Sequence, residues 1–235
     1  MVYGIILSGG IGSRMQSGNL PKQYIEIKDT PVLIYTIRAF DRSPHIDHIV
    51  VVANEEWHEQ IRQWVSQHGI QKPVTLTQNG DNRQNSIISG LRACAAIRTP
   101  ADEDKVLVHD AVRPFVSQRI IADCVSALDQ SSCCLTAIPD YDTTYISLDG
   151  ETIADQIDRS KLVMGQTPEG FALKQYLELN EAATTQELEH LHGGCELMFM
   201  RGYPIQLVLG SPLNLKLTRP DDLTLFQALF DSNAL

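Results

Sequence analysis

Residues 2–15, which read VYGIILSGGIGSRM, join an apolar run of strand length directly to a glycine-rich loop. The run is nearly continuous in its apolar character, which is typical of a strand buried on both faces. The loop frees the backbone amides at three glycines within four positions and then adds the cation of Arg14. Bare amides beside cations suit a triphosphate, although glycines alone are equally consistent with an ordinary strand-to-helix turn.

The loop fails to match either common nucleotide motif. A G-x-G-x-x-G fingerprint needs glycine where Met15 stands, and a Walker A loop needs a G-K-[ST] ending. A dinucleotide-dependent reductase is therefore excluded. Lys22, in LPKQY, adds a second cation to the same loop region, so any phosphate is expected to be held locally.

Further runs of strand length follow at 48–53, 73–77 and 105–110, and segments with helical character separate the strands. We expect the helices to begin after the N-caps Thr30, Asp81 and Ser117. Strand and helix alternation predicts an α/β fold with a Rossmann-like, mostly parallel sheet and helices on both faces. A chain of 235 residues with 43% hydrophobic content fits one domain, residues 1–235.

A hairpin arm is expected at 139–163, where the pattern changes. The stretch TTYISLDGETIADQI alternates polar and apolar residues, and Asp149-Gly150 is a strong signal for a two-residue turn. The sequence shows no repeat and no linker that would mark a second domain.

Composition narrows the function classes. A formal net charge of -10 argues against nucleic-acid binding. The N-terminus lacks the features of a signal peptide, and no apolar run approaches the length of a membrane span, so we expect a cytoplasmic protein without membrane partners. The five cysteines have no metal or redox spacing and are expected to be buried thiols. They are Cys94, Cys124, Cys133, Cys134 and Cys195.

Parallel sheets bind ligands at the carboxyl ends of their strands, and this rule draws attention to HDAVRPF and GDNRQNSI. Asp110 ends a buried strand, and a buried carboxylate needs a nearby metal ion or arginine. His109 is expected to be a hydrogen-bonded core residue. The glycine, amides and serine at 80–87 can recognise a base, while Arg83 meets a phosphate or a neighbouring carboxylate.

Five stretches, taken together, resemble one family. ILSGGIGSRM…LPKQY, GDNRQNSI, HDAVRPF, DRSKLVMGQTPEGF and NLKLTRPDDL have the order and spacing of the cytidylyltransferases that act on ribitol phosphate and on methylerythritol phosphate. The resemblance covers almost the whole chain. It implies the nucleotide-diphospho-sugar transferase type of fold and transfer of CMP from CTP to a phosphorylated polyol, with release of pyrophosphate and with magnesium as cofactor.

The resemblance also assigns roles to individual residues. The implied catalytic cations are Arg14, Lys22 and Lys216. The implied nucleotide-binding residues are Ser8, Gly9, Gly10, Gly12, Gly80, Asp81, Arg83, Ser86, Asp110 and Ala111, with Asp110 also near the metal. The implied acceptor-binding residues are Asp142, Thr143, Arg159 and Thr167. In this family the arm crosses to a second subunit, which implies a homodimer with composite sites.

The SGG, HDAVRPF, GQTP and CEL stretches are closer to the ribitol phosphate group, so D-ribitol 5-phosphate is the expected acceptor. Methylerythritol phosphate is the alternative. A nucleotide-binding regulator without turnover is a third hypothesis, although it has less need of cations aimed at a leaving group. One departure stands out: both groups usually carry an acidic TD stretch where this chain has glycines, at 192–194. If that acid helps to hold the acceptor or the metal, the polyol is a different one.

Overall fold

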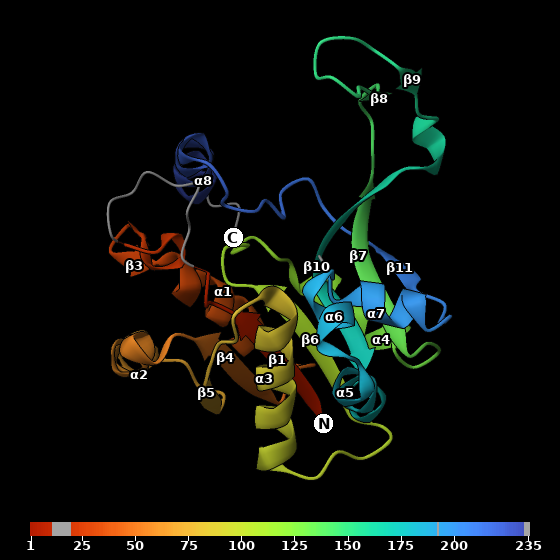
Figure 1. The fold of residues 1–235 in the computed structure, drawn as a ribbon. Helices are drawn as coiled ribbons and strands as arrows, with labels where there is room; N and C mark the ends of the chain where they lie inside the picture. The colour runs from red at the N-terminus through yellow and green to blue at the C-terminus, as the bar shows by residue number, and fades with distance from the viewer. Residues whose placement is uncertain (11–19, 192, 233–235) are drawn as a thin grey trace.

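The computed structural model describes residues 1–10, 20–191 and 193–232 (Figure 1). Within this part of the chain, seven strands form one central sheet. In spatial order they are β11 (Gln206–Leu209), β7 (Cys133–Pro139), β10 (Val163–Ala172), β6 (Lys105–Asp110), β1 (Val2–Leu7), β4 (His48–Ala53) and β5 (Val74–Gln78). Strand β10 runs antiparallel to β6 and β7, and the other neighbouring pairs are parallel. The mostly parallel sheet predicted from the sequence is confirmed.

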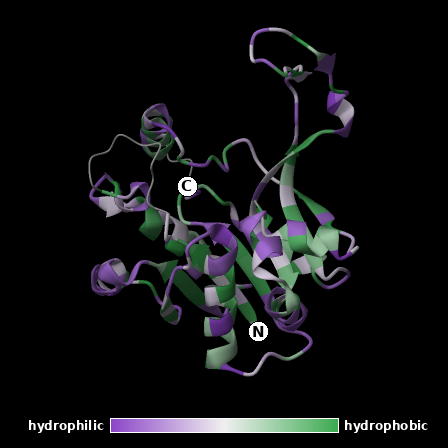
Figure 2. Cartoon of the chain, in the orientation of Figure 1, coloured by the Kyte–Doolittle hydropathy of each residue, from purple (hydrophilic) through white to green (hydrophobic). Residues whose placement is uncertain are grey.

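The central strands are apolar on both faces, which explains their nearly continuous hydrophobic runs. Along β1, Tyr3 and Ile5 belong to one buried cluster and Ile6 belongs to the opposite one. The predicted strands at 2–7, 48–53 and 105–110 are confirmed, and β5 begins one residue later than predicted. Figure 2 shows the apolar residues concentrated along these strands.

Helices cover both faces of the sheet, as predicted. One face carries α1 (Val32–Asp41), α2 (His58–Gln67) and α4 (Gln118–Ala127). The other carries α3 (Arg83–Ile97), α5 (Leu173–Ala182) and α7 (Cys195–Met200), with α6 (Thr185–Glu189) packed against α3 and α7. Helix α8 (Pro220–Asp231) packs on the start of α1. Across the described ranges, every helix falls short of the length and apolar character needed to cross a bilayer.

The short elements are the 3-10 helices η1 (Lys22–Tyr24), η2 (Glu55–Trp57) and η3 (Arg159–Lys161) and the strand pair β2 (Glu26–Ile27) and β3 (Thr30–Pro31). This pair overturns one predicted cap. Lys28 and Asp29 both have positive φ, as in a tight hairpin turn, and this turn places Thr30 in β3, opposite Ile27. Helix α1 therefore begins at Val32 without a side-chain cap.

The other two predicted caps have different outcomes. Ser117 caps α4, because its hydroxyl accepts a hydrogen bond from the amide of Ile120. Asp81 is not the cap of α3. Asn82 lies one residue closer to the helix in an extended conformation, and its side chain accepts a hydrogen bond of 2.8 Å from the amide of Asn85.

The segment expected to form an arm lies between the end of β7 and the start of β10 and projects from the body of the molecule (Figure 1). It contains the antiparallel strands β8 (Tyr145–Ile146) and β9 (Asp155–Gln156). The predicted two-residue turn is wrong, because residues 147–154 form a longer loop. The carboxylate of Asp149 accepts hydrogen bonds from the backbone amides of Glu151 and Thr152, which stabilises this wider turn.

Candidate active site

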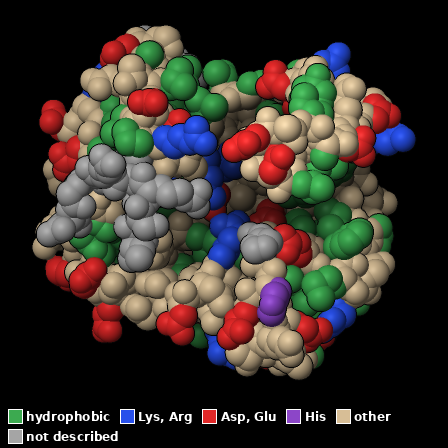
Figure 3. Space-filling model, turned by 45° about the horizontal axis from the view of Figure 1, so that its top comes forward, with side chains coloured by type: hydrophobic (Ala, Val, Ile, Leu, Met, Phe, Trp, Pro, Cys, Tyr) green, Lys and Arg blue, Asp and Glu red, His purple; other side chains and the backbone are tan. Residues whose placement is uncertain are grey.

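Two adjoining cavities open at the carboxyl edge of the parallel strands. Their volumes are about 570 Å³ and about 310 Å³, and Arg83, Asp110 and Lys216 line both. Figure 3 shows basic side chains gathered in this hollow. The cavities lie at the ends of β1, β5 and β6, where a parallel sheet is expected to bind its ligands.

The structure brings most of the expected site residues to these cavities. The larger cavity is lined by Gly9, Gly10, Lys22, Gly80, Asp81, Arg83, Ser86, Asp110, Ala111 and Lys216, and the smaller one by Thr167. Ser8 instead turns its hydroxyl toward Tyr24 in the core. Asp142, Thr143 and Arg159 lie on the projecting arm, where Arg159 donates a hydrogen bond to the carbonyl of Tyr141. Gly12 and Arg14 lie outside the described residues.

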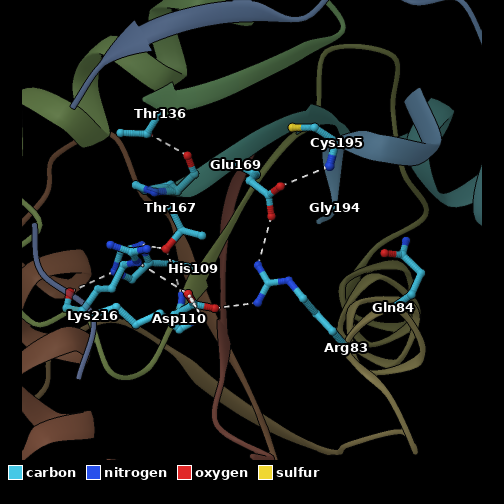
Figure 4. Close-up of polar contacts among 12 residues, drawn as sticks. Arg83, Gln84, His109, Asp110, Thr136, Thr167, Glu169, Gly194, Cys195 and Lys216 are labelled. Atoms are coloured by element: carbon cyan, nitrogen blue, oxygen red, sulfur yellow. Dashed lines mark hydrogen bonds and ion pairs between the residues drawn. The ribbon is translucent and has the colours of Figure 1, made fainter. Parts of the chain in front are cut away.

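Asp110 is the centre of an ion-pair network (Figure 4). Its Oδ1 lies 2.5 Å from Arg83 Nη1, and its Oδ2 lies 2.9 Å from Lys216 Nζ and 3.5 Å from Arg113 Nε. Burial alone would raise the pKa of Asp110, but these three cations outweigh it and hold the pKa well below its ordinary value. The expected cation beside this buried carboxylate is therefore an arginine, supported by two further cations.

Glu169, on β10, is a second carboxylate that the sequence analysis did not identify. Its Oε2 accepts a hydrogen bond of 3.0 Å from Arg83 Nη2, so that Arg83 bridges Glu169 and Asp110. Burial lowers the pKa of Arg83, but the two carboxylates more than compensate and raise it. Arg83 thus remains charged and pairs with both acids. Of the two partners expected for Arg83 from the sequence, a phosphate or a neighbouring carboxylate, the structure shows the carboxylate.

Glycine is required at two places where loops meet in the larger cavity. A Cβ at Gly80 would clash with the backbone of Asn85, and one at Gly9 would clash with the side chain of Asn79. Buried Gln23 holds residues 8–10 at the start of the glycine loop, because its Nε2 donates to the carbonyls of Ser8 (2.6 Å) and Gly10 (3.0 Å). Gln23 was missed because a polar residue beside Lys22 has no distinctive sequence signal.

The Ser86 hydroxyl serves the loop that precedes α3. It accepts a hydrogen bond from the amide of Gly80 and donates one to the carbonyl of Asn82. Ser86 therefore shapes the wall of the larger cavity through the backbone it binds.

His109 is fully buried beneath the network, and the prediction of a hydrogen-bonded core histidine is confirmed. Its Nε2 lies 3.0 Å from the carbonyl of Arg113 and its Nδ1 lies 3.0 Å from the hydroxyl of Thr167. Burial lowers the pKa of His109 to about 4, so the ring is neutral at physiological pH. The Thr167 hydroxyl also accepts a hydrogen bond from the amide of Asp110, which ties the end of β6 to β10.

All five cysteines are free and buried, as predicted. Among the described residues, no group of three or more His, Cys, Asp or Glu side chains could hold a metal ion by itself. Magnesium at nucleotide sites needs only one or two carboxylates, because phosphates and water supply its other ligands. Asp110 offers one carboxylate at the boundary of the cavities, which fits a magnesium ion shared with substrate phosphates.

The edge at which these groups meet is where doubly wound sheets bind nucleotides, and cations fixed beside it serve phosphate transfer. The fold and the site define the class as a nucleotidyltransferase. Comparison with known proteins narrows this class. The family model for 2-C-methyl-D-erythritol 4-phosphate cytidylyltransferase (IspD) matches residues 2–232, and the chain belongs to this family.

The chain is similar to its relatives over nearly the full length of both sequences. The chain is 32% identical to a ribitol-5-phosphate cytidylyltransferase from Vibrio parahaemolyticus, covering 99% of this chain and 97% of the relative. It is 33% identical to a ribitol-5-phosphate cytidylyltransferase from Streptococcus pneumoniae, covering 99% and 100%. Its fold is similar to the crystal structure of 4-diphosphocytidyl-2C-methyl-D-erythritol synthase from Anaerococcus prevotii, with a TM-score of 0.82, 24% identity, and coverage of 98% and 96%.

Proposed function

We propose that this enzyme transfers CMP from CTP to D-ribitol 5-phosphate, giving CDP-ribitol and pyrophosphate. The observation that carries the proposal is the pair of adjoining cavities, one larger and one smaller, that share Arg83, Asp110 and Lys216. Such an arrangement suits a nucleoside triphosphate and a smaller phosphorylated acceptor whose phosphates meet at the shared residues. The curated relatives named for ribitol 5-phosphate support the choice of acceptor.

In the proposed reaction, a phosphate oxygen of the acceptor attacks the α-phosphorus of CTP as the bond to pyrophosphate breaks. The chemistry requires no covalent enzyme intermediate, so the contribution of the protein is positioning and charge stabilisation. We assign this stabilisation to Lys22 and Lys216, together with Arg14 from the glycine loop. Lys216 lines both cavities, which suits contact with the phosphorus that changes bonds.

For the nucleotide we assign the backbone of Gly9 and Gly10 to the phosphates and the loop at 80–86 to the cytidine. Magnesium bound to the triphosphate would neutralise charge on the phosphates, and Asp110 is the residue we assign to hold it. Asp110 also keeps Arg83 and Lys216 in place before substrate arrives, because it pairs with both.

The acceptor site is proposed to include a second subunit. Thr167 lines the smaller cavity, whereas Asp142, Thr143 and Arg159 lie on the arm. The arm exposes large apolar side chains, including Tyr141 and Leu148 at 72% and 88%, which favours its burial against another copy of the chain. We propose a homodimer in which each arm contributes its acceptor residues to the partner, and we expect it to act in the cytoplasm.

The second candidate acceptor is 2-C-methyl-D-erythritol 4-phosphate, because the matching family model carries its name. Pyrophosphate release distinguishes the two when CTP and magnesium are supplied with each acceptor in separate reactions. We expect release with ribitol 5-phosphate, formation of CDP-ribitol by mass spectrometry, and strongly reduced rates for Lys22→Ala. Equal or faster turnover of methylerythritol phosphate would overturn the assignment of the acceptor, and turnover of neither would direct the search to other phosphorylated polyols.

A further inference from the structure

The smaller cavity has lining residues that it does not share with the larger one. Among the described residues, the charged side chains that line this cavity alone are Arg113, Glu169 and Glu196. Glu169 is more deeply buried than Glu196, since only 4% of its surface is exposed. It is held within the sheet, opposite Val108 on β6 and Leu135 on β7.

The position of Glu169 is fixed from two sides. Arg83 Nη2 donates to its Oε2 at 3.0 Å, and the amide of Cys195 donates to its Oε1 at 3.1 Å (Figure 4). A carboxylate has about four lone-pair positions. Each oxygen accepts one of these two bonds from the described residues, which leaves lone-pair positions on a residue that lines the smaller cavity.

The glycine segment that departs from the family pattern lies against this acid. A Cβ at Gly194 would be 2.9 Å from Glu169 Oε2 and 3.2 Å from the hydroxyl of Tyr176, and a Cβ at Gly193 would be 3.5 Å from Glu169 Oε1. Glycine at 194 therefore leaves the room that the Glu169 carboxylate occupies. Gly193 and Gly194, which carry no acidic side chain, therefore lie beside an acid from β10.

We propose that Glu169 is a specificity-determining residue that accepts hydrogen bonds from the hydroxyl groups of the acceptor, at the end of the polyol opposite its phosphate. This inference rests on the proposed function, which places the acceptor in the smaller cavity. The acceptor phosphate has to meet CTP near Asp110 and Lys216, so the polyol extends away from the larger cavity and toward Glu169. Arg83 holds the carboxylate in place, since the guanidinium bridges it to Asp110.

The test compares Glu169→Gln with wild type in steady-state kinetics, using ribitol 5-phosphate and 1-deoxyribitol 5-phosphate, which lacks the terminal hydroxyl. Replacing a charged acceptor by a neutral one weakens a hydrogen bond, so kcat/KM for ribitol 5-phosphate is expected to fall about tenfold or more. The deoxy substrate is expected to lose much less, and the KM for CTP is expected to stay within about twofold. Glu178→Gln on the exposed face of α5 makes the same chemical change away from the cavities and is expected to behave as wild type.

Equal losses for the two acceptors, or a changed KM for CTP alone, would overturn the inference and give Glu169 a structural role. Glu169→Asp provides a second test if the glutamine variant does not fold, because it keeps the charge on Arg83 paired but shortens the side chain by one methylene. Its preference for ribitol 5-phosphate over the deoxy analogue is expected to decrease, and an unchanged preference would contradict the inference. If wild type turns over neither acceptor, the proposed function is wrong, and the inference, which rests on it, is wrong as well.

Discussion

The variant Asp110→Asn tests the ion-pair network on which the site is built. Asp110 is buried and has hydrogen-bonded ion pairs with Arg83 at 2.5 Å and with Lys216 at 2.9 Å, besides its contact with Arg113. A hydrogen bond to a charged group contributes about 1.5–3 kcal/mol, and breaking a buried pair costs about 3–5 kcal/mol. Because the Lys216 side chain is 38% exposed, its share is reduced by solvent, and we expect a total loss near 3 kcal/mol.

The stability lost in the same variant is expected to depend on pH. The folded-state pKa of Asp110 is depressed, so its contribution is fully present above the unfolded-state pKa of about 3.9 and is lost as pH falls below it. Asparagine lacks this dependence. The difference in unfolding free energy between wild type and variant should therefore shrink by about 1 kcal/mol between pH 7 and pH 3.

Urea unfolding followed by circular dichroism at several pH values measures both effects. Asp102→Asn is the matched control, because Asp102 pairs with Lys174 at 2.8 Å on the exposed surface and such pairs contribute little. A loss below about 1 kcal/mol at pH 7, or a difference that stays constant on acidification, would refute the reasoning.

Three further substitutions and one titration have defined outcomes. Lys22→Ala should lower kcat by about a hundredfold or more if the lysine stabilises the transition state, and a wild-type rate would remove that role. Arg159→Ala should raise the KM for the acceptor and leave CTP binding intact, whereas weaker CTP binding would assign Arg159 to the nucleotide. Gly90→Ala should cost about 1–3 kcal/mol in urea unfolding, because the new Cβ would lie 2.8 Å from Ile5 Cγ2. NMR titration should show that His109 remains neutral until about pH 4. Because burial lowers its pKa, the contribution of His109 to stability is complete above the unfolded-state pKa of about 6.5 and declines as pH falls toward 4.

Of the seven strands that the structure describes in the central sheet, β1, β4, β5 and β6 were predicted from the sequence and β7, β10 and β11 were not. Burial on both faces requires short, continuous apolar runs, and β1, β4 and β6 display them. The helix starts were less predictable, since a cap depends on the backbone conformation that precedes it. The turn at Lys28 and Asp29 commits Thr30 to a strand, and no local preference for threonine at a cap reveals this.

The site was predictable where it follows strand ends and not where it depends on tertiary pairing. Asp110 and Arg83 were predictable from their places at the end of β6 and the start of α3. Glu169 does not, because β10 is far along the chain and runs antiparallel between β6 and β7. Only this insertion brings Glu169 beside Arg83. The arm residues are a related case, since their assignment to the acceptor depends on a second copy of the chain.

The network also explains how an acidic protein can present cations to a triphosphate. Arg83, Arg113 and Lys216 would repel one another in a partly buried site, but Asp110 and Glu169 lie among them and leave one net positive charge. The cations are thus oriented before any substrate binds, which is the condition under which fixed charges stabilise a transition state most effectively. The two carboxylates divide the task. Asp110 is shared by both cavities and orients the cations, while Glu169 faces the smaller cavity alone, where it is available to distinguish one acceptor from another.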